Sequence, residues 1–229
     1  LYQPQRDEDN SWEEMKRFLM EVESLLQKEN GIPGYEETSP HGIITAFDFR
    51  YHLYAPLIHV QGKGLEISVS PVSLNAGEKT MVDLLKAYCD EHASSLHQID
   101  LVLLRNKSKA GIGFFEADNF YPDYILWMNA KDVQYITFID PKGLRLVSRD
   151  DRKVQFYASI KELEERLLPS YPDKRIVLNS FILSSTPSAE LRQWWQMDKA
   201  QREARHVLCL DQADCIEVMM AKVLSSIAK

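Results

Sequence analysis

The chain lacks any long apolar run. None of its segments approaches the ~18 consecutive apolar residues of a membrane span, and no basic segment followed by an apolar one marks a secretion signal. We therefore expect a cytoplasmic protein with no membrane partner. Because the chain begins with Leu1 rather than Met, we also expect it to be a fragment of a longer protein.

Cysteine is scarce as well. Cys89, Cys209 and Cys215 are odd in number and widely spaced, which argues against a disulfide framework. His206 together with Cys209 and Cys215 suggests a zinc trio, but no fourth ligand has the spacing of known zinc signatures. A packing role is the better interpretation of these residues.

Positive charge is in deficit. The net charge of −7 argues against a surface that attracts nucleic acid everywhere, but it leaves room for a local basic track. Arg105, Lys107 and Lys109 follow one predicted strand and Arg145 follows another, so these four are candidate DNA-backbone contacts. Ordinary solvated surface explains the same residues equally well.

A phosphate-binding loop is also missing. The segment GEKT at 77–80 resembles the end of such a loop, but Glu78 displaces the lysine and no upstream glycine fits the G-x-x-x-x-G-K-[ST] pattern. We therefore expect no ATP site in this chain.

The apolar pattern that is present alternates between helical and strand periods, which predicts an α/β protein with a mixed central sheet flanked by helices. Residues 1–70 are expected to hold a helix and strands, and 71–229 the main domain. A capping box at Ser159 and Glu162 marks one helix start in the main domain. The expected elements are a helix at 11–28, a loop at 29–41, strands at 43–49, 54–60 and 65–72, a helix at 75–92, strands at 99–104, 120–128 and 135–140, a helix at 160–168, a strand at 176–183, a helix at 187–204, a strand at 206–210 and a helix at 214–227.

Two of these strands carry charges that a buried strand normally avoids. Asp123 lies within the strand at 120–128, and Asp140 and Lys142 lie at the end of the next one. Alternate residues of a strand share a face, so Asp140 and Lys142 point the same way, about 6 to 7 Å apart. Such charges are costly unless something is bound to them.

The surroundings of these charges suggest what is bound. A short polar turn at 129–132 joins the two strands, which makes them antiparallel neighbours. Pro122 and Pro141 cannot donate to a sheet ladder, so we expect the strands to splay and the Pro141 carbonyl to face an ion. Glu78 lies in the apolar stripe of the helix predicted at 75–92 and adds a third carboxylate.

Carboxylates and a carbonyl are hard oxygen ligands, suited to Mg²⁺ or Mn²⁺. The predicted metal ligands are Glu78, Asp123, Asp140 and the Pro141 carbonyl, with Lys142 orienting a water or stabilising phosphate charge. A purely structural role is the alternative: a buried pair of Asp140 and Lys142, Asp123 capping a turn, and Glu78 at a helix edge.

The motifs at Pro122-Asp123 and Asp140-Pro141-Lys142 resemble the PD-(D/E)xK nuclease superfamily. Further likeness covers most of residues 70–229, in LLRN, GIGFFEADNFYPDYILW, YITFIDPKGLR and VLNSFILSSTP. These segments resemble the C-terminal endonuclease domain of type III restriction-like DEAD/DEAH helicase-nucleases.

That resemblance implies a restriction-endonuclease-like core and a magnesium-dependent DNA endonuclease activity. It also implies that the domain belongs to a bacterial anti-phage defence protein, is joined to a helicase or translocase motor, and can bind other subunits of the defence system. It implies that Asp123 and Asp140 bind metal, that Lys142 is the catalytic lysine and that Glu78 is the helix carboxylate. Residues 1–70 would then connect to the motor. The competing hypothesis is a catalytically silent module of nuclease fold that binds DNA or docks a protein.

Overall fold

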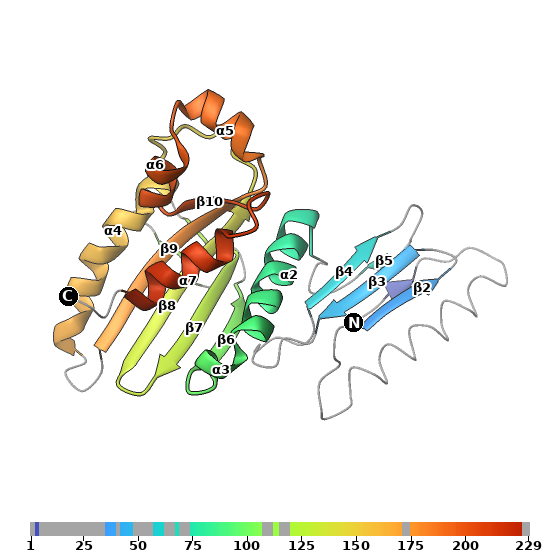
Figure 1. Ribbon diagram of the computed structural model, residues 1–229, viewed down its shortest axis with the longest axis horizontal. Coiled ribbons are helices and arrows are strands. Elements are labelled where there is room, and N and C mark those ends of the chain that lie inside the picture. Colours follow the sequence, from blue (N-terminus) through green and yellow to red (C-terminus); the bar gives the residue numbers. More distant parts are fainter. Residues whose placement is uncertain are drawn as a thin grey trace. The chain divides into compact units, whose positions relative to one another are not determined.

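The computed structural model divides the chain into two compact units, Leu1–Ala76 and Gly77–Lys229 (Figure 1). In the first unit it describes five strands and residues 74–76. In the second it describes residues 77–106, 112–114, 120–170 and 175–225.

The described strands of the first unit form two small antiparallel sheets. Strands β2 (Tyr35–Ser39), β3 (Gly42–Phe47) and β4 (Leu57–Gln61) form one in that order, and β1 (Gln3–Pro4) pairs with β5 (Ile67–Ser68) in the other. The prediction of a loop over 29–41 is wrong at β2, where pairing with β3 outweighs the turn signals around it. The helix predicted at 11–28 lies outside the described residues.

A five-stranded mixed sheet organises the second unit. Its order is β10-β9-β8-β7-β6, antiparallel from β6 to β8 and parallel from β8 to β10. This confirms the predicted α/β class with a mixed sheet between helices. The strands are β6 (Asp100–Arg105), β7 (Tyr124–Ala130), β8 (Val133–Lys142), β9 (Arg175–Ser184) and β10 (Val207–Cys209).

Six α-helices and one 3-10 turn are described in and around this sheet. They are α2 (Ala76–Glu91), α3 (Ala93–Leu96), α4 (Arg152–Leu167), the 3-10 turn η2 (Leu168–Ser170), α5 (Ser188–Trp195), α6 (Lys199–Ala204) and α7 (Cys215–Ser225). No helix within the described ranges is both long and apolar enough to cross a membrane.

Helix α4 covers one face of the sheet, alongside β9 (Figure 1). Its side chains Phe156 and Ile160 pack on alternate residues of three neighbouring strands, as the period of two requires. Burying each large apolar side chain contributes roughly 1.5–3 kcal/mol. The buried cluster consists of Phe120, Ile125, Phe138, Phe156, Ile160, Ile176 and Leu178.

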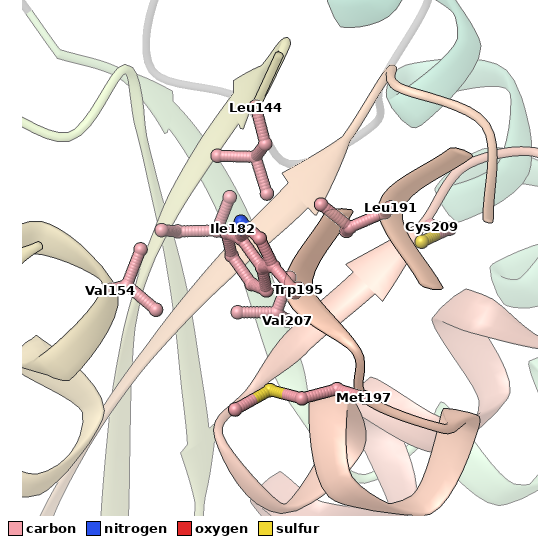
Figure 2. Close-up of a cluster of buried hydrophobic side chains, with 8 residues drawn as sticks. All are labelled: Leu144, Val154, Ile182, Leu191, Trp195, Met197, Val207 and Cys209. Atoms are coloured by element: carbon pink, nitrogen blue, oxygen red, sulfur yellow. The ribbon is translucent and has the colours of Figure 1, made fainter. Parts of the chain in front are cut away.

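A second buried cluster joins the ends of β8, β9 and β10 to α5 (Figure 2). Trp195 is buried at its centre, with its indole nitrogen donating to the Val147 carbonyl at 3.0 Å. Cys209 packs in the same cluster, which confirms the packing role predicted for it. The members are Leu144, Val154, Ile182, Leu191, Trp195, Met197, Val207 and Cys209.

Helix α4 begins eight residues before its predicted start. Asp151 caps it by accepting a hydrogen bond from the Lys153 amide at 2.8 Å, so the prediction that Ser159 and Glu162 cap the helix is wrong. Ser159 instead lies within the helix and donates to the Phe156 carbonyl. The earlier start places Val154 in the second cluster.

The single helix predicted at 187–204 is also wrong, because the chain breaks it in two. Gln196 ends α5 in the left-handed conformation, with φ of 51°. Asp198 then starts α6 with a capping box whose other member is Gln201. The predicted span contains both stop and start signals, and these outweigh its helical periodicity.

Only the last part of β9 pairs with β10, over Ile182–Ser184. Upstream of this pairing, side chains bond to the edge of β9. Lys161 donates to the Leu178 carbonyl at 2.6 Å, and Glu164 accepts from the Leu178 amide at 2.6 Å. Nδ1 of His206 bonds to the Ser180 carbonyl at 3.0 Å, so this nitrogen carries the proton. These bonds satisfy backbone groups that burial would otherwise penalise.

We predict that His206 makes the fold sensitive to acid. Burial is the main cause that lowers its pKa to about 4, and the charges of Lys222 and Lys161 add to this effect. The hydrogen bond to Ser180 acts in the opposite direction. The unfolded chain, in which its pKa is near 6.5, therefore binds more protons. Stability from this group is present above pH 6.5 and is lost as pH falls towards 4, by up to about 3 kcal/mol.

Urea unfolding of the wild type and His206→Asn between pH 7 and pH 4 measures this effect. Asparagine tolerates the left-handed backbone of His206, with φ of 56°. The variant should lose less stability over this range. If the free energy of unfolding falls by the same amount in both proteins between pH 7 and pH 4, the prediction is contradicted.

Candidate functional site

The candidate site lies where β7 and β8 separate. The last pair of their ladder is Tyr124 with Ile139, so the next residues outward are Asp123 and Asp140. Asp123 comes just before β7, and its carbonyl accepts from the Asn106 amide at 2.7 Å. The predicted antiparallel pairing is therefore confirmed, and it places the two aspartates opposite each other.

Strand β8 continues past this point along β9 alone. Asp140, Pro141 and Lys142 all pair with β9, so the predicted splaying occurs only on the β7 side. The Lys142 carbonyl accepts from the Ser185 amide at 3.0 Å and so points towards β9. The neighbouring Pro141 carbonyl must then point the other way, towards the gap left by β7.

Asp140 and Lys142 share one face of β8, as predicted from their spacing. They form an ion pair, and the Asp140 side chain is only 8% exposed. The Lys142 ammonium also lies 5.4 Å from the centre of the Phe120 ring, within cation–π range. This lysine is therefore held at the site by a charge and by an aromatic ring.

Asp123 lies close enough to Asp140 for its carboxyl to be strongly perturbed. Burial raises the pKa of Asp123 to about 7, and the charge of Asp140 and a hydrogen bond with it add to the effect. The charge of Glu78 acts in the same direction, and Lys142 opposes it. The site therefore favours an added positive charge, either a proton or a cation, between the two carboxyl groups.

Glu78 is placed differently from the two aspartates. It lies in the first turn of α2, is 6% exposed, and pairs with Arg105 at 3.4 Å. Arg105 pairs with Tyr124 in the ladder between β6 and β7. The side chains of Arg105 and Tyr124 therefore point to the face of the sheet opposite Asp123 and Asp140. The buried Tyr124 phenol has a raised pKa, mainly through burial and then through the charge of Glu78.

The donor set at the site fits a hard cation. Within the described residues, no group of three or more His, Cys, Asp or Glu side chains is placed to hold a metal ion. Two carboxylates and one carbonyl remain, from Asp123, Asp140 and Pro141. Mg²⁺ is commonly held by one or two carboxylates while it keeps several waters, so these oxygens suit it. A ligand role for Glu78 stays a prediction.

The predicted DNA contacts are scattered. Arg105 bonds to Glu78 as described, and Arg145 lies in the exposed turn after β8, where it pairs with Glu190 at 3.3 Å. Lys107 and Lys109 lie outside the described residues. Arg145 is therefore the one of the four whose described surroundings leave it accessible to a large ligand.

Two residues at the site have no role in the sequence-based prediction. Phe120 is buried beneath Lys142, and Asn106 binds the backbone next to Asp123. Phe120 reads as one more apolar residue of a strand, and a single asparagine after a strand resembles an ordinary turn residue. Only the three-dimensional contacts reveal them.

No family model, no curated protein and no solved structure matches this chain.

We predict that Asp123→Asn stabilises the protein at alkaline pH when metal is absent. The folded wild type keeps a proton on Asp123 that the unfolded chain releases above pH 3.8, so wild-type stability falls as pH rises through about 7. Asparagine removes this loss. The variant should melt at least about 5 °C above the wild type at pH 8 in EDTA, from a shift of this size.

Differential scanning calorimetry at pH 5 and pH 8 measures this difference. Asp132→Asn, in the exposed turn between β7 and β8, is a matched control that should leave the pH dependence unchanged. If the melting temperatures of Asp123→Asn and the wild type differ by the same amount at both pH values, the pKa of the Asp123 carboxyl is not perturbed.

Proposed function

We propose that the second unit is a metal-dependent DNA endonuclease of the PD-(D/E)xK type. The observation that carries the proposal is the close approach of Asp123, Asp140 and Lys142 at one end of neighbouring strands. Two carboxylates that share excess negative charge, with a lysine beside them, form a set suited to a cation and a phosphate. The mixed sheet between helices agrees with the restriction-endonuclease-like core that the resemblance implies.

Each residue has a defined task in this proposal. Asp123, Asp140 and the Pro141 carbonyl would hold Mg²⁺, for which Mn²⁺ would substitute. A metal held there would supply a coordinated water of lowered pKa and would offset charge on the phosphate. Lys142 donates hydrogen bonds from its ammonium to a phosphate oxygen or to the attacking water, while Asp140 holds it in place.

Glu78 contributes through its charge in this arrangement. It raises the pKa of Asp123 from the other side of the sheet, so it increases the affinity of the aspartate pair for a cation. Arg105 balances part of this charge. Arg145 is the proposed contact to the DNA backbone, together with the predicted contacts Lys107 and Lys109.

The wider context of the enzyme follows from the sequence resemblance. We propose that a helicase or translocase motor belongs to the same full-length protein, that the whole acts in bacterial anti-phage defence in the cytoplasm, and that residues 1–70 lead to the motor. The second unit would cut DNA, and the motor would supply the ATP-driven movement.

A silent DNA-binding or docking module is the second candidate. One observation favours it: no described group of three or more acidic, histidine or cysteine side chains is placed to bind a metal. Trp194, which is 46% exposed, offers an apolar contact for a partner, whereas its neighbour Trp195 is buried in the core. Such a module would not need metal for stability.

We predict that Lys142→Ala slows DNA cutting strongly. Loss of one charged donor at a phosphoryl-transfer site lowers kcat by about 100- to 1000-fold. Supercoiled plasmid and a labelled single strand, incubated in Mg²⁺, Mn²⁺ or EDTA, measure cutting and its strand preference. Lys86→Ala, which removes an exposed pair on α2, is the control and should cut like the wild type.

Cutting by Lys142→Ala at the wild-type rate would refute the proposed role of this lysine. If the wild type is itself inactive, melting with and without millimolar Mn²⁺ separates the two candidates. If the domain is a nuclease that is inactive without its motor, Mn²⁺ should raise the melting temperature of the wild type. Mn²⁺ should leave the melting temperature of Asp140→Ala unchanged. A silent module should show no such difference.

A further inference from the structure

Asn106 hydrogen-bonds to the backbone of three residues beside the candidate site. It follows β6 directly, and its backbone amide nitrogen donates to the Asp123 carbonyl at 2.7 Å. Its side-chain nitrogen donates to the Pro122 carbonyl at 2.8 Å and to the Ile112 carbonyl at 2.7 Å. Its side-chain oxygen accepts from the Ile112 amide at 3.0 Å.

These bonds use the full chemistry of an asparagine amide. The nitrogen supplies two donors and the oxygen an acceptor, a combination that aspartate and alanine lack. The pair of bonds with Ile112 resembles the pairing between two strands. One side chain therefore fastens the backbone at Ile112 to the backbone at Pro122.

The ladder between β7 and β8 does not hold Asp123. This ladder ends at Tyr124, and Pro122 has no amide hydrogen to donate. The side chain of Asn106 binds the Pro122 carbonyl, directly before Asp123. Its backbone amide binds the Asp123 carbonyl and extends the β6–β7 pairing by one residue, a bond that remains when the side chain is replaced. This support matters because the Asp123 carboxyl lies against a second carboxyl group, and that contact is repulsive when both are charged.

The stretch beyond this anchor is held by other contacts. Phe114 and Phe120 pair through two backbone hydrogen bonds of 2.7 and 3.0 Å. Their rings pack against Phe156 of α4, with centroids 4.5 and 5.4 Å from it. Removing the Asn106 side chain should therefore loosen Pro122 and Asp123 locally and leave the aromatic packing in place.

We infer that Asn106 is a positioning residue that holds the Asp123 carboxyl group at the site. The inference deepens the proposed nuclease function and rests on it. Asn106 does not touch the reacting atoms. Its side chain acts through the backbone directly before Asp123, so its loss should impair the metal site and the chemical step more than DNA binding.

The test compares Asn106→Ala and Asn106→Asp with Asn129→Ala. The Asn106→Asp variant would keep the acceptor for the Ile112 amide and lose both bonds that the side chain donates. Asn129 is an exposed residue at the other end of β7 whose side chain bonds to Gln134, so it is a matched control. Three quantities are measured: kcat and KM for plasmid cutting, the Mn²⁺ concentration that gives half of the thermal stabilisation, and amide hydrogen exchange of peptides covering 120–126.

Both Asn106 variants should lower kcat and weaken the Mn²⁺ response by about 10- to 100-fold, the usual loss when support of a metal ligand is removed. KM for DNA should stay within about twofold, because the DNA contacts are elsewhere. Exchange at 120–126 should accelerate in both variants and not in Asn129→Ala. The second Asn106 variant keeps the test decisive if the alanine variant does not fold.

Wild-type kcat and Mn²⁺ response in either folded Asn106 variant would overturn the inference. A rise in KM with unchanged kcat would also overturn it, since that pattern indicates DNA contact rather than positioning. If the wild type neither cuts nor responds to Mn²⁺, the nuclease proposal fails. The exchange data then decide the structural claim alone, and unchanged exchange at 120–126 in the variants would refute it.

Discussion

The rest of the site depends on one unfavourable contact, the approach of the Asp123 and Asp140 carboxyl groups at the end of β7 and β8. Burial and the neighbouring Asp140 carboxylate raise the pKa of Asp123 to about 7, so negative charge on both groups is disfavoured. A fold tolerates such a contact when its surroundings fix both groups firmly. Here the ladder with β9 fixes Asp140, and Asn106 fixes the backbone of Asp123.

The sheet also arranges the charges around this pair. Lys142 lies on the same face and partly neutralises Asp140, whereas Glu78 and Arg105 form their own pair on the opposite face. Glu78 still acts on Asp123 through its field. The described site therefore brings two carboxylates and a lysine together, and the third carboxylate acts on Asp123 through its charge.

The parts of this site that depend on local periodicity could be predicted from the sequence. The alternation of β8 places Asp140 and Lys142 on one face, and the polar turn after β7 makes the two strands antiparallel. The face occupied by Glu78 could not be predicted, because an apolar helical stripe shows that a helix packs on a sheet but not on which side. Asn106 leaves no periodic signal, since its bond to Pro122 spans 16 residues.

The boundaries of helices were the weakest predictions for a related reason. Ser159 fits a capping pattern, yet Asp151 starts α4 because the packing of Val154 requires an earlier turn. Between α5 and α6, a left-handed Gln196 interrupts a pattern that reads as continuous helix. At α4 a packing contact accompanies one of two local capping signals, whereas between α5 and α6 local stop and start signals interrupt the helical periodicity.

Calorimetric titration of Mn²⁺ into the wild type and Asp140→Asn at pH 7, in two buffers of different ionisation enthalpy, tests the central claim most directly. A metal site on Asp123 and Asp140 should give one binding event in the wild type, with release of a proton from the aspartate pair, and no such event in the variant. Equal binding by both proteins, or no binding by the wild type, would contradict a metal site built on Asp123 and Asp140.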